Sequence, residues 1–313
     1  MPQLRSSKCL LTHSKVSTAN NIIRLVNSYK LIYLLAIAIP EYERQSDPDY
    51  KTHQFQFVCS ACSKPCALHC ALCLENLSRS TMESYRNAID DDGVITKSLL
   101  ATDRHPADDL CILSAMCFIK LSITTPGSIT PEFRSDTHVS RLLQATVLLE
   151  NAWSHSKSNF QISLLLVKLY SSLGCGSLAL RAYQRLGLKQ VQLDSLSCIL
   201  FDRISTLHPH PVQHNPDESS ESRNPAEYLE KQQKFYKAAR GQISKNRWKC
   251  FEQGSYNSIF EITQVSEMLF HSMSSISSVV ESRKIARLLT PGTPLTALSC
   301  GYDILRNYIP TAL

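Results

Sequence analysis

Apolar residues recur every three to four positions through most of the chain, which is the spacing of helices that bury one face. The clearest pattern predicts four helices at 138–154, 158–174, 177–187 and 194–206. Ser158 or Asn159 is expected to cap the second helix, while Gly174 and Gly187 are expected to end the second and third. Because the turns between them are very short, we expect helical hairpins stacked on one another.

Further helices are predicted on both sides of this block. Two are expected at about 22–39 and 66–92. A third starts after Asp103, its expected N-cap, and carries Asp108 and Asp109 as solvated acids at the positive end of its dipole. Two long helices are expected at 226–251 and 255–289, after a proline-rich stretch with almost no apolar residues.

These patterns divide the chain into four segments, which are a leader at 1–60, a helical-repeat segment at 61–207, a flexible linker at 208–225 and a long-helix segment at 226–313. Within the repeat segment, one stretch matches the tetratricopeptide (TPR) pattern of Leu and Tyr, a Leu-Gly turn, then Ala and Tyr. The matching residues are Leu166, Tyr170, Leu173, Gly174, Ala179, Ala182 and Tyr183. We therefore predict an all-α fold, a TPR-like α-solenoid of stacked helical hairpins, with an isolated hairpin in a compact bundle as the alternative.

Composition agrees with the helical class. Only 9 of 313 residues are glycine, which disfavours Rossmann, P-loop and multi-hairpin β folds. The longest apolar run, at 31–40, is about half of the ~20 residues that a membrane-spanning helix needs, so no membrane partner is expected. The basic start of the chain lacks the apolar core of a secretory signal, so we expect a reducing, cytoplasmic location.

No catalytic, cofactor-binding or metal site is predicted. The Gly174-Cys175-Gly176 turn has the glycines of an acyl-CoA loop, but it follows a helix and lacks the Gln or Arg that begins such a loop. His208, His210 and His214 lie in the linker and are expected to be solvated.

One cluster has the residue types of a zinc site. Its members crowd into fifteen positions rather than two separated knuckles, so half-exposed or buried thiols are favoured over metal. They are Cys59, Cys62, Cys66, His69, Cys70 and Cys73.

Positive charge gathers in the first long helix after the linker. Between 226 and 250, seven Lys and Arg residues accompany only Glu227 and Glu230, which accounts for most of the net charge of +6. Lys245, Arg247 and Lys249 are the best candidates to contact RNA or an acidic protein, because Trp248 beside them is expected to anchor the helix. The alternative is a solvated helix face.

The stretch at 158–207 resembles the auxiliary subunit of the N-terminal acetyltransferase B (NatB) complex. The shared residues are Asn159-Phe160-Gln161, Leu169-Tyr170, Leu173-Gly174, Lys189, Gln192 and Asp194-Ser195-Leu196. Flanking stretches at 104–116 and 228–289 extend the resemblance to roughly 95–290. Family members are much longer, so we expect this chain to correspond to a middle portion.

The resemblance implies a non-catalytic α-solenoid rather than an enzyme. Such a subunit binds a GNAT-type catalytic subunit and helps place it at the ribosome. The complex acetylates nascent chains that begin Met-Asp, Met-Glu, Met-Asn or Met-Gln. It implies no cofactor for this chain itself. The alternative is a TPR- or HEAT-like adaptor with a different client.

Overall fold

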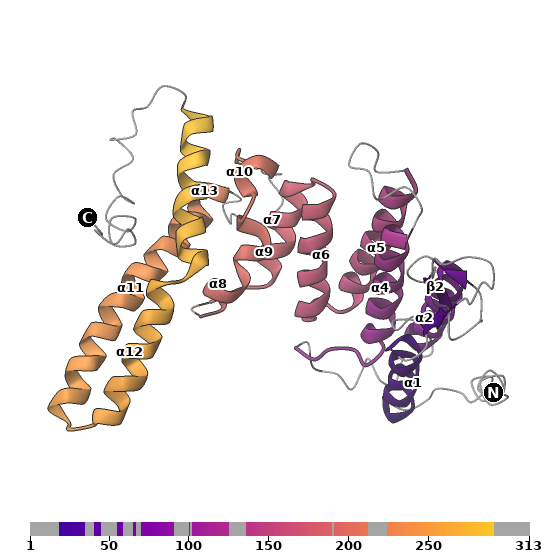
Figure 1. Cartoon of the computed structure of the whole chain (residues 1–313), viewed down its shortest axis with the longest axis horizontal. Coiled ribbons are helices and arrows are strands. Elements are labelled where there is room, and N and C mark those ends of the chain that lie inside the picture. The colour runs from indigo at the N-terminus through magenta and orange to yellow at the C-terminus, as the bar shows by residue number, and fades with distance from the viewer. Residues whose placement is uncertain are drawn as a thin grey trace. The chain divides into compact units, whose positions relative to one another are not determined.

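The computed structural model describes a chain built mainly from helices (Figure 1). It describes residues 19–34, 41–44, 55–58, 65–66, 70–90, 100, 102–124, 136–189, 191–211 and 224–290. The all-α class is confirmed, and the solenoid arrangement stays a prediction. The chain forms two compact units, 1–162 and 163–313, so the division falls inside one helix. The four-segment division predicted from the sequence also stays a prediction.

The first unit contains four described helices: α1 (Ala19–Ile32), α2 (Ala71–Asp90), α4 (Asp108–Thr124) and α5 (Asp136–His155). Helix α4 packs against both α2 and α5, which explains why its apolar residues occur all round the helix. Small residues let these neighbours approach closely. Ala115 is fully buried, and the hydroxyls of Ser78 and Ser114 share a hydrogen bond of 2.8 Å between α2 and α4.

A small antiparallel sheet also lies in the first unit, and the sequence pattern does not predict it. Its strands are β1 (Glu41–Arg44), β2 (Phe55–Val58) and β3 (Pro65–Cys66), paired in the order β1-β2-β3. Tyr42 pairs with Phe57, and Phe57 pairs in turn with Cys66. Since Cys66 belongs to a strand, the helix predicted from 66 begins at Ala71 instead.

The start of α4 corrects two predictions. Asp103 does not cap the helix, because its carboxylate accepts the N–H of Leu100 at 3.2 Å. His105 Nδ1 accepts the N–H of Ala107 at 3.1 Å, just before the helix begins. Asp108 is not solvated: it is 1% exposed, and the Asn159 side-chain amide donates to its carboxylate at 2.8 Å. Burial raises the pKa of Asp108.

In the second unit the predicted helical hairpin forms from α6 (Phe160–Ser172), whose first turn contains the unit boundary, and α7 (Gly176–Arg185). The Asn159 side chain accepts the N–H of Gln161 at 3.1 Å, which confirms it as the cap. Gly174 and Gly187 have positive φ angles of 78° and 56°, as the ends of these helices require.

The helix predicted at 194–206 is wrong, because this stretch forms three short helices. They are α8 (Val191–Leu196), α9 (Cys198–Phe201) and α10 (Ile204–Leu207). The chain leaves helical geometry at Arg203, where φ is −138°. The N–H of Ser205 donates at 2.9 Å to the carboxylate of Glu281, a residue much later in the chain. A tertiary contact therefore uses the N–H of Ser205, which in a continuous helix would donate to the carbonyl four residues earlier.

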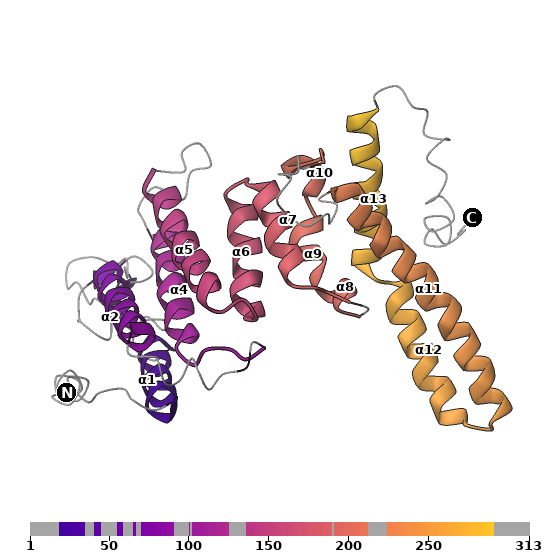
Figure 2. The ribbon, with the colours of Figure 1, turned by 180° about the vertical axis from the view of Figure 1, so that it is seen from behind.

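Three long helices complete the second unit: α11 (Pro225–Glu252), α12 (Tyr256–Phe270) and α13 (Met273–Leu289). Helices α11 and α12 lie side by side as a hairpin in both views (Figures 1 and 2), and α11 also contacts α13. The single helix predicted at 255–289 is wrong because it is divided at Ser272, whose hydroxyl caps α13. Among the described helices, none is both long and apolar enough to cross a bilayer.

Candidate partner-binding surface on α11 and α12

Helix α11 is held in the second unit by its first half. The Asn224 side chain caps it by accepting the N–H of Ala226 at 3.1 Å, and Pro225 occupies the first turn. Leu229, Gln232 and Tyr236 are buried at spacings of three and four residues, so they form one face of the helix. Gln232 donates to the Ser197 hydroxyl at 2.6 Å, which ties this face to the turn between α8 and α9.

Asp194 joins α11 to the start of α13. The Tyr236 hydroxyl donates to its carboxylate at 2.7 Å, and the Ser272 hydroxyl donates to the same oxygen. The Ser274 hydroxyl donates to the Asp194 carbonyl at 2.6 Å. Burial raises the pKa of Tyr236 to about 12, so this phenol stays protonated and remains a donor at neutral pH. The Asp194-Ser195-Leu196 segment thus has a structural role in this unit.

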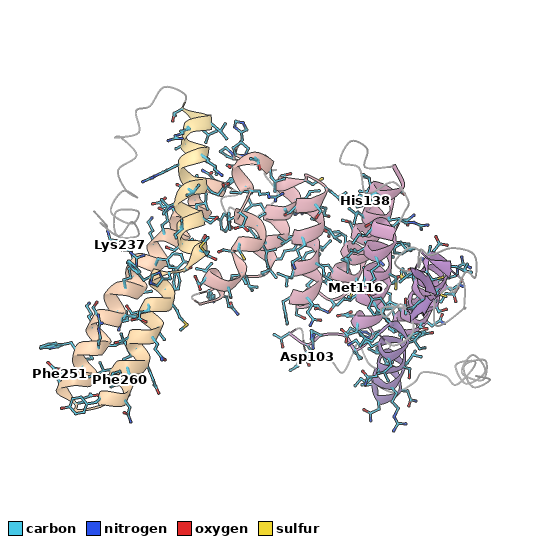
Figure 3. The ribbon with its side chains drawn as sticks, in the orientation of Figure 1. Asp103, Met116, His138, Lys237, Phe251 and Phe260 are labelled. Carbon is cyan, nitrogen blue, oxygen red and sulfur yellow. The ribbon has the colours of Figure 1, made fainter. Side chains whose placement is uncertain are left out.

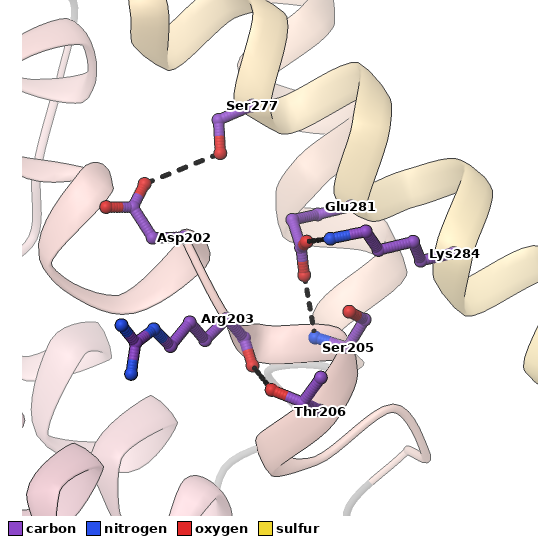
Figure 4. A network of polar contacts seen from close by, with 7 residues as sticks. All are labelled: Asp202, Arg203, Ser205, Thr206, Ser277, Glu281 and Lys284. Carbon is purple, nitrogen blue, oxygen red and sulfur yellow. Dashed lines mark hydrogen bonds and ion pairs between the residues drawn. The ribbon is translucent and has the colours of Figure 1, made fainter.

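A second polar network joins α10 to α13 (Figure 4). Glu281 is 1% exposed, and it accepts hydrogen bonds from the Ser205 N–H and from the Lys284 ammonium, the latter at 2.7 Å. Burial opposes ionisation, but these hydrogen bonds outweigh it and lower the pKa of Glu281. Nearby, the Ser277 hydroxyl donates to Asp202 at 3.4 Å. These contacts hold α13, which packs against α11, in place on α10.

The second half of α11 and all of α12 lack buried residues. No residue of α11 after Tyr236 is buried, and none of α12 is. Large apolar side chains are instead exposed, among them Phe251 at 57% and Phe260 at 73%. Figure 3 shows these two near the turn that joins the helices. The hairpin therefore presents a large surface to solvent within the described chain.

Lys245, Arg247 and Lys249 all lie exposed on this hairpin, and within the described part of the chain no ion pair involves them. At 100° per residue, Lys245 and Lys249 share a face of α11, whereas Arg247 points to nearly the opposite side. The expectation that Trp248 anchors the helix is wrong. Trp248 is 63% exposed and stacks on Phe251, with ring centroids 5.8 Å apart.

The remaining basic residues of α11 have different environments. Lys234 forms an exposed ion pair of 2.7 Å with Glu230 one turn earlier. The Arg240 guanidinium lies over the ring of Phe270 on α12, 5.9 Å from its centroid, and is half-buried. The positive charge seen in the sequence is therefore not uniformly available. Lys234 is paired and Arg240 is half-buried, whereas Lys231, Lys237 and the three cations near the turn of the hairpin are exposed.

The other candidate residues do not assemble into a described site. Cys70 is buried and Cys73 half-buried, while the side chains of Cys59, Cys62, Cys66 and His69 lie outside the described residues. No cluster of three or more metal-ligating side chains occurs among the residues that the structure describes. The zinc alternative therefore stays open as the sequence left it.

The Gly174-Cys175-Gly176 turn has a packing role. A Cβ atom on Gly176 would lie 2.6 Å from Cβ of His208, so the glycine permits close contact with the end of α10. His208 is accordingly half-buried rather than solvated, and burial lowers its pKa. His210 is exposed as expected, and His214 lies outside the described residues.

Sequence reasoning missed the polar residues that join these elements. Glu281 gives no local signal, because an acidic residue in an amphipathic helix is usually solvated. The sequence predicts Asp194 only as the start of a helix and as part of the resemblance, with no tertiary contact of its own. Ser205, which donates to Glu281, and Tyr236, which donates to Asp194, are far from these acids in the sequence. Only the folded structure shows that these residues lie within hydrogen-bonding distance.

Comparison with known proteins finds a family that matches most of the chain and several relatives that match part of it. A family model described as "N-acetyltransferase B complex (NatB) non catalytic subunit" matches residues 3–303. The "Phagocyte signaling-impaired protein" of Aedes aegypti is 31% identical over 157 residues, which cover 48% of this chain and 15% of that protein. The "N-terminal acetyltransferase B complex subunit arm1" of Schizosaccharomyces pombe is 27% identical over 145 residues, covering 46% and 16%.

A human relative gives a similar picture. "N-alpha-acetyltransferase 25, NatB auxiliary subunit" of Homo sapiens is 28% identical over 122 residues, which cover 39% of this chain and 11% of the human protein. The aligned part of the chain therefore spans less than a fifth of the length of each of these three relatives.

Proposed function

Because the chain belongs to the family of NatB non-catalytic subunits, we propose that it binds the GNAT-type catalytic subunit of NatB and acts as its scaffold. The family match over residues 3–303 is the observation that carries this proposal. As a member of a non-catalytic family, the chain is not itself an enzyme, and the resemblance noted in its sequence is confirmed. The acetylated substrates would be nascent chains beginning Met-Asp, Met-Glu, Met-Asn or Met-Gln, in the cytoplasm.

The proposed mode of binding uses the faces of stacked helices. Helix pairs joined by short turns, as at α6 and α7, are the units from which TPR-like solenoids are built. In such a solenoid the concave side offers a long surface to a globular partner. We expect the catalytic subunit to lie against that side.

Co-purification tests the scaffold role. The 313-residue chain is co-expressed with a tagged NatB catalytic subunit, and the eluate is analysed by size exclusion and mass spectrometry. We expect a stoichiometric complex that acetylates Met-Asp peptides, while the isolated chain with acetyl-CoA shows no turnover. Recovery of the chain with other proteins but without the acetyltransferase subunit would instead favour an adaptor with a different client.

For the ribosome, we propose that Lys245, Arg247 and Lys249 contact ribosomal RNA. The exposure of all three side chains and the absence of ion pairs to them within the described chain support this role. Ribosomal RNA presents dense phosphate, so a few cations can localise a complex without reading sequence. The competing account is that these cations bind an acidic surface of the catalytic subunit.

Charge reversal separates the two accounts. The triple variant Lys245→Glu, Arg247→Glu and Lys249→Glu is compared with a control variant on the same helix, Lys234→Glu with Lys237→Glu. We expect only the first to lose co-sedimentation with ribosomes, while both keep the catalytic subunit. Loss of the catalytic subunit in the first variant contradicts the RNA assignment, as does equal loss of ribosome binding in both.

A further inference from the structure

A pocket of about 730 Å³ lies in the second unit, between the end of α7, helices α8 and α9, and the first half of α11. It is separate from the exposed end of the hairpin. Its walls combine aromatic, aliphatic and cationic side chains. The lining residues are Tyr183, Gln184, Gly187, Leu188, Lys189, Leu193, Phe201, Tyr228, Lys231 and Gln232.

Three aromatic rings form one wall. Phe201 and Tyr228 stack with their centroids 6.2 Å apart, and Tyr183 meets both edge-on, at centroid distances of 5.1 and 6.4 Å. Tyr183 and Phe201 are 4% and 3% exposed, so the rings form a packed surface rather than a set of free faces. Such a wall, completed by Leu188 and Leu193, suits a compact apolar side chain.

Both charged residues that line the pocket are positive. Lys189 and Lys231 are exposed, and no acidic residue lines the pocket. Neither lysine has an ion-pair partner in the described part of the chain, and the Lys231 ammonium lies 5.8 Å from the centroid of the Tyr228 ring. A ligand that brings carboxylates to these two lysines would make contacts that the chain itself does not supply.

We propose that this pocket binds a short acidic segment of a partner protein, which inserts one apolar side chain beside Leu188 and Leu193 and places its flanking carboxylates near Lys189 and Lys231. This inference goes beyond the scaffold role, since it concerns a peptide-binding pocket and stands whether or not the catalytic subunit binds elsewhere on the chain. The apolar anchor supplies burial, and the carboxylates supply orientation.

A single-stranded nucleic acid fits the pocket less well, although it too is anionic. Binding of a base requires an open aromatic face on which to stack. Here the Phe201 and Tyr228 rings already stack on each other, Tyr183 presents its edge to them, and Lys231 lies over Tyr228. The ring arrangement therefore favours an aliphatic or thioether side chain over a base.

A peptide array tests the proposal on the full chain. The peptides carry a central Leu, Met, Ile or Ser flanked on each side by Asp and Glu, and a matched set replaces every acid with Asn or Gln. We expect retention of acidic peptides with an apolar centre, at least about tenfold above the Ser-centred and neutral peptides, since a tenfold difference is smaller than the loss that follows truncation of a typical anchor residue. A uridine octamer serves as the nucleic-acid probe and is expected to bind more weakly.

Variants locate the binding. The pair Lys189→Glu and Lys231→Glu is expected to lower affinity for the best acidic peptide at least about tenfold, while Lys237→Glu on the same helix changes it less than about twofold. Leu193→Asn is expected to remove the preference for an apolar centre. Circular dichroism and thermal melting verify that each variant remains folded.

Three results would overturn the proposal. The first is that no acidic peptide is retained above its neutral counterpart. The second is that the lysine pair and Lys237→Glu reduce affinity equally, which would indicate attraction to the general positive charge of α11. The third is that the uridine octamer binds as tightly as the best peptide. None of these bears on co-purification with the catalytic subunit, so the two proposals fail separately.

Discussion

The absence of a side chain at Gly176 allows the start of α7 to pack closely against the end of α10. A Cβ atom there would lie 2.6 Å from Cβ of His208 and 3.1 Å from the Leu207 carbonyl carbon. We expect Gly176→Ala to lower the free energy of unfolding by about 1–3 kcal/mol through overpacking. Gly241→Ala is the control, because its Cβ would meet nothing within 4 Å inside α11, and it is expected to stabilise by about 0.5–1 kcal/mol. Denaturant unfolding followed by circular dichroism measures both, and losses of equal size would contradict the packing role.

Asp108 provides a pH-dependent prediction at the same scale. Burial raises its folded-state pKa above the unfolded value, so the folded state binds the proton more tightly. Stability from this group is present below the unfolded pKa and is lost as pH rises through the folded pKa. Asp108→Asn cannot ionise but can still accept the Asn159 hydrogen bond.

We therefore expect the stability of Asp108→Asn, relative to the natural chain, to increase as pH rises above about 4, the ordinary Asp value. Urea unfolding at a series of pH values measures the difference. Asp109→Asn is the control at the neighbouring, partly exposed site, where an ion pair of 2.7 Å with Lys30 is lost instead. A difference for Asp108→Asn that stays constant across the series would show that burial of this carboxylate has no energetic consequence.

At the scale of elements, Ser272 decides where α12 ends and α13 begins. Its hydroxyl accepts the N–H of Ser275 at 3.2 Å and also contacts Asp194. We expect Ser272→Ala to reduce stability by about 1–2 kcal/mol, the upper range for loss of an N-cap. Ser255 precedes α12 in the same position but makes no capping hydrogen bond from its side chain, so Ser255→Ala is expected to change stability by less than about 0.5 kcal/mol. Thermal unfolding compares the two, and similar changes would argue against the capping role.

At the scale of the whole molecule, the proposed contact with ribosomal RNA predicts a particular salt dependence. Each phosphate neutralised by a Lys or Arg releases counterions, so the logarithm of the binding constant falls linearly with the logarithm of salt concentration. Reversal of Lys245, Arg247 and Lys249 is expected to reduce the steepness of this slope by about 2–3, since each contact contributes about 0.7–0.9. Sedimentation with ribosomes over a range of salt measures it. An unchanged slope would place the RNA contacts elsewhere.

Local patterns were sufficient for many individual elements. The periodicity of apolar residues located most of the helices, and the cap at Asn159 and the positive φ angles at Gly174 and Gly187 follow from single residue types. These features depend on interactions within one turn of the chain, which neighbouring residues control. The helical class and the likeness to NatB auxiliary subunits were therefore accessible from the sequence.

Where helices break, and which polar side chains are buried, was decided by tertiary structure. The stretch at 194–206 is divided because Glu281 takes the N–H of Ser205, and Asp108 is buried because Asn159 packs against it. Trp248 is exposed because no later helix covers its side of α11 within the described chain. By itself the sequence determined most of the helical elements and the family, since these are encoded in local periodicity and residue order. Only the fold decided burial and pairing, because both depend on residues that are distant in the chain and meet after packing.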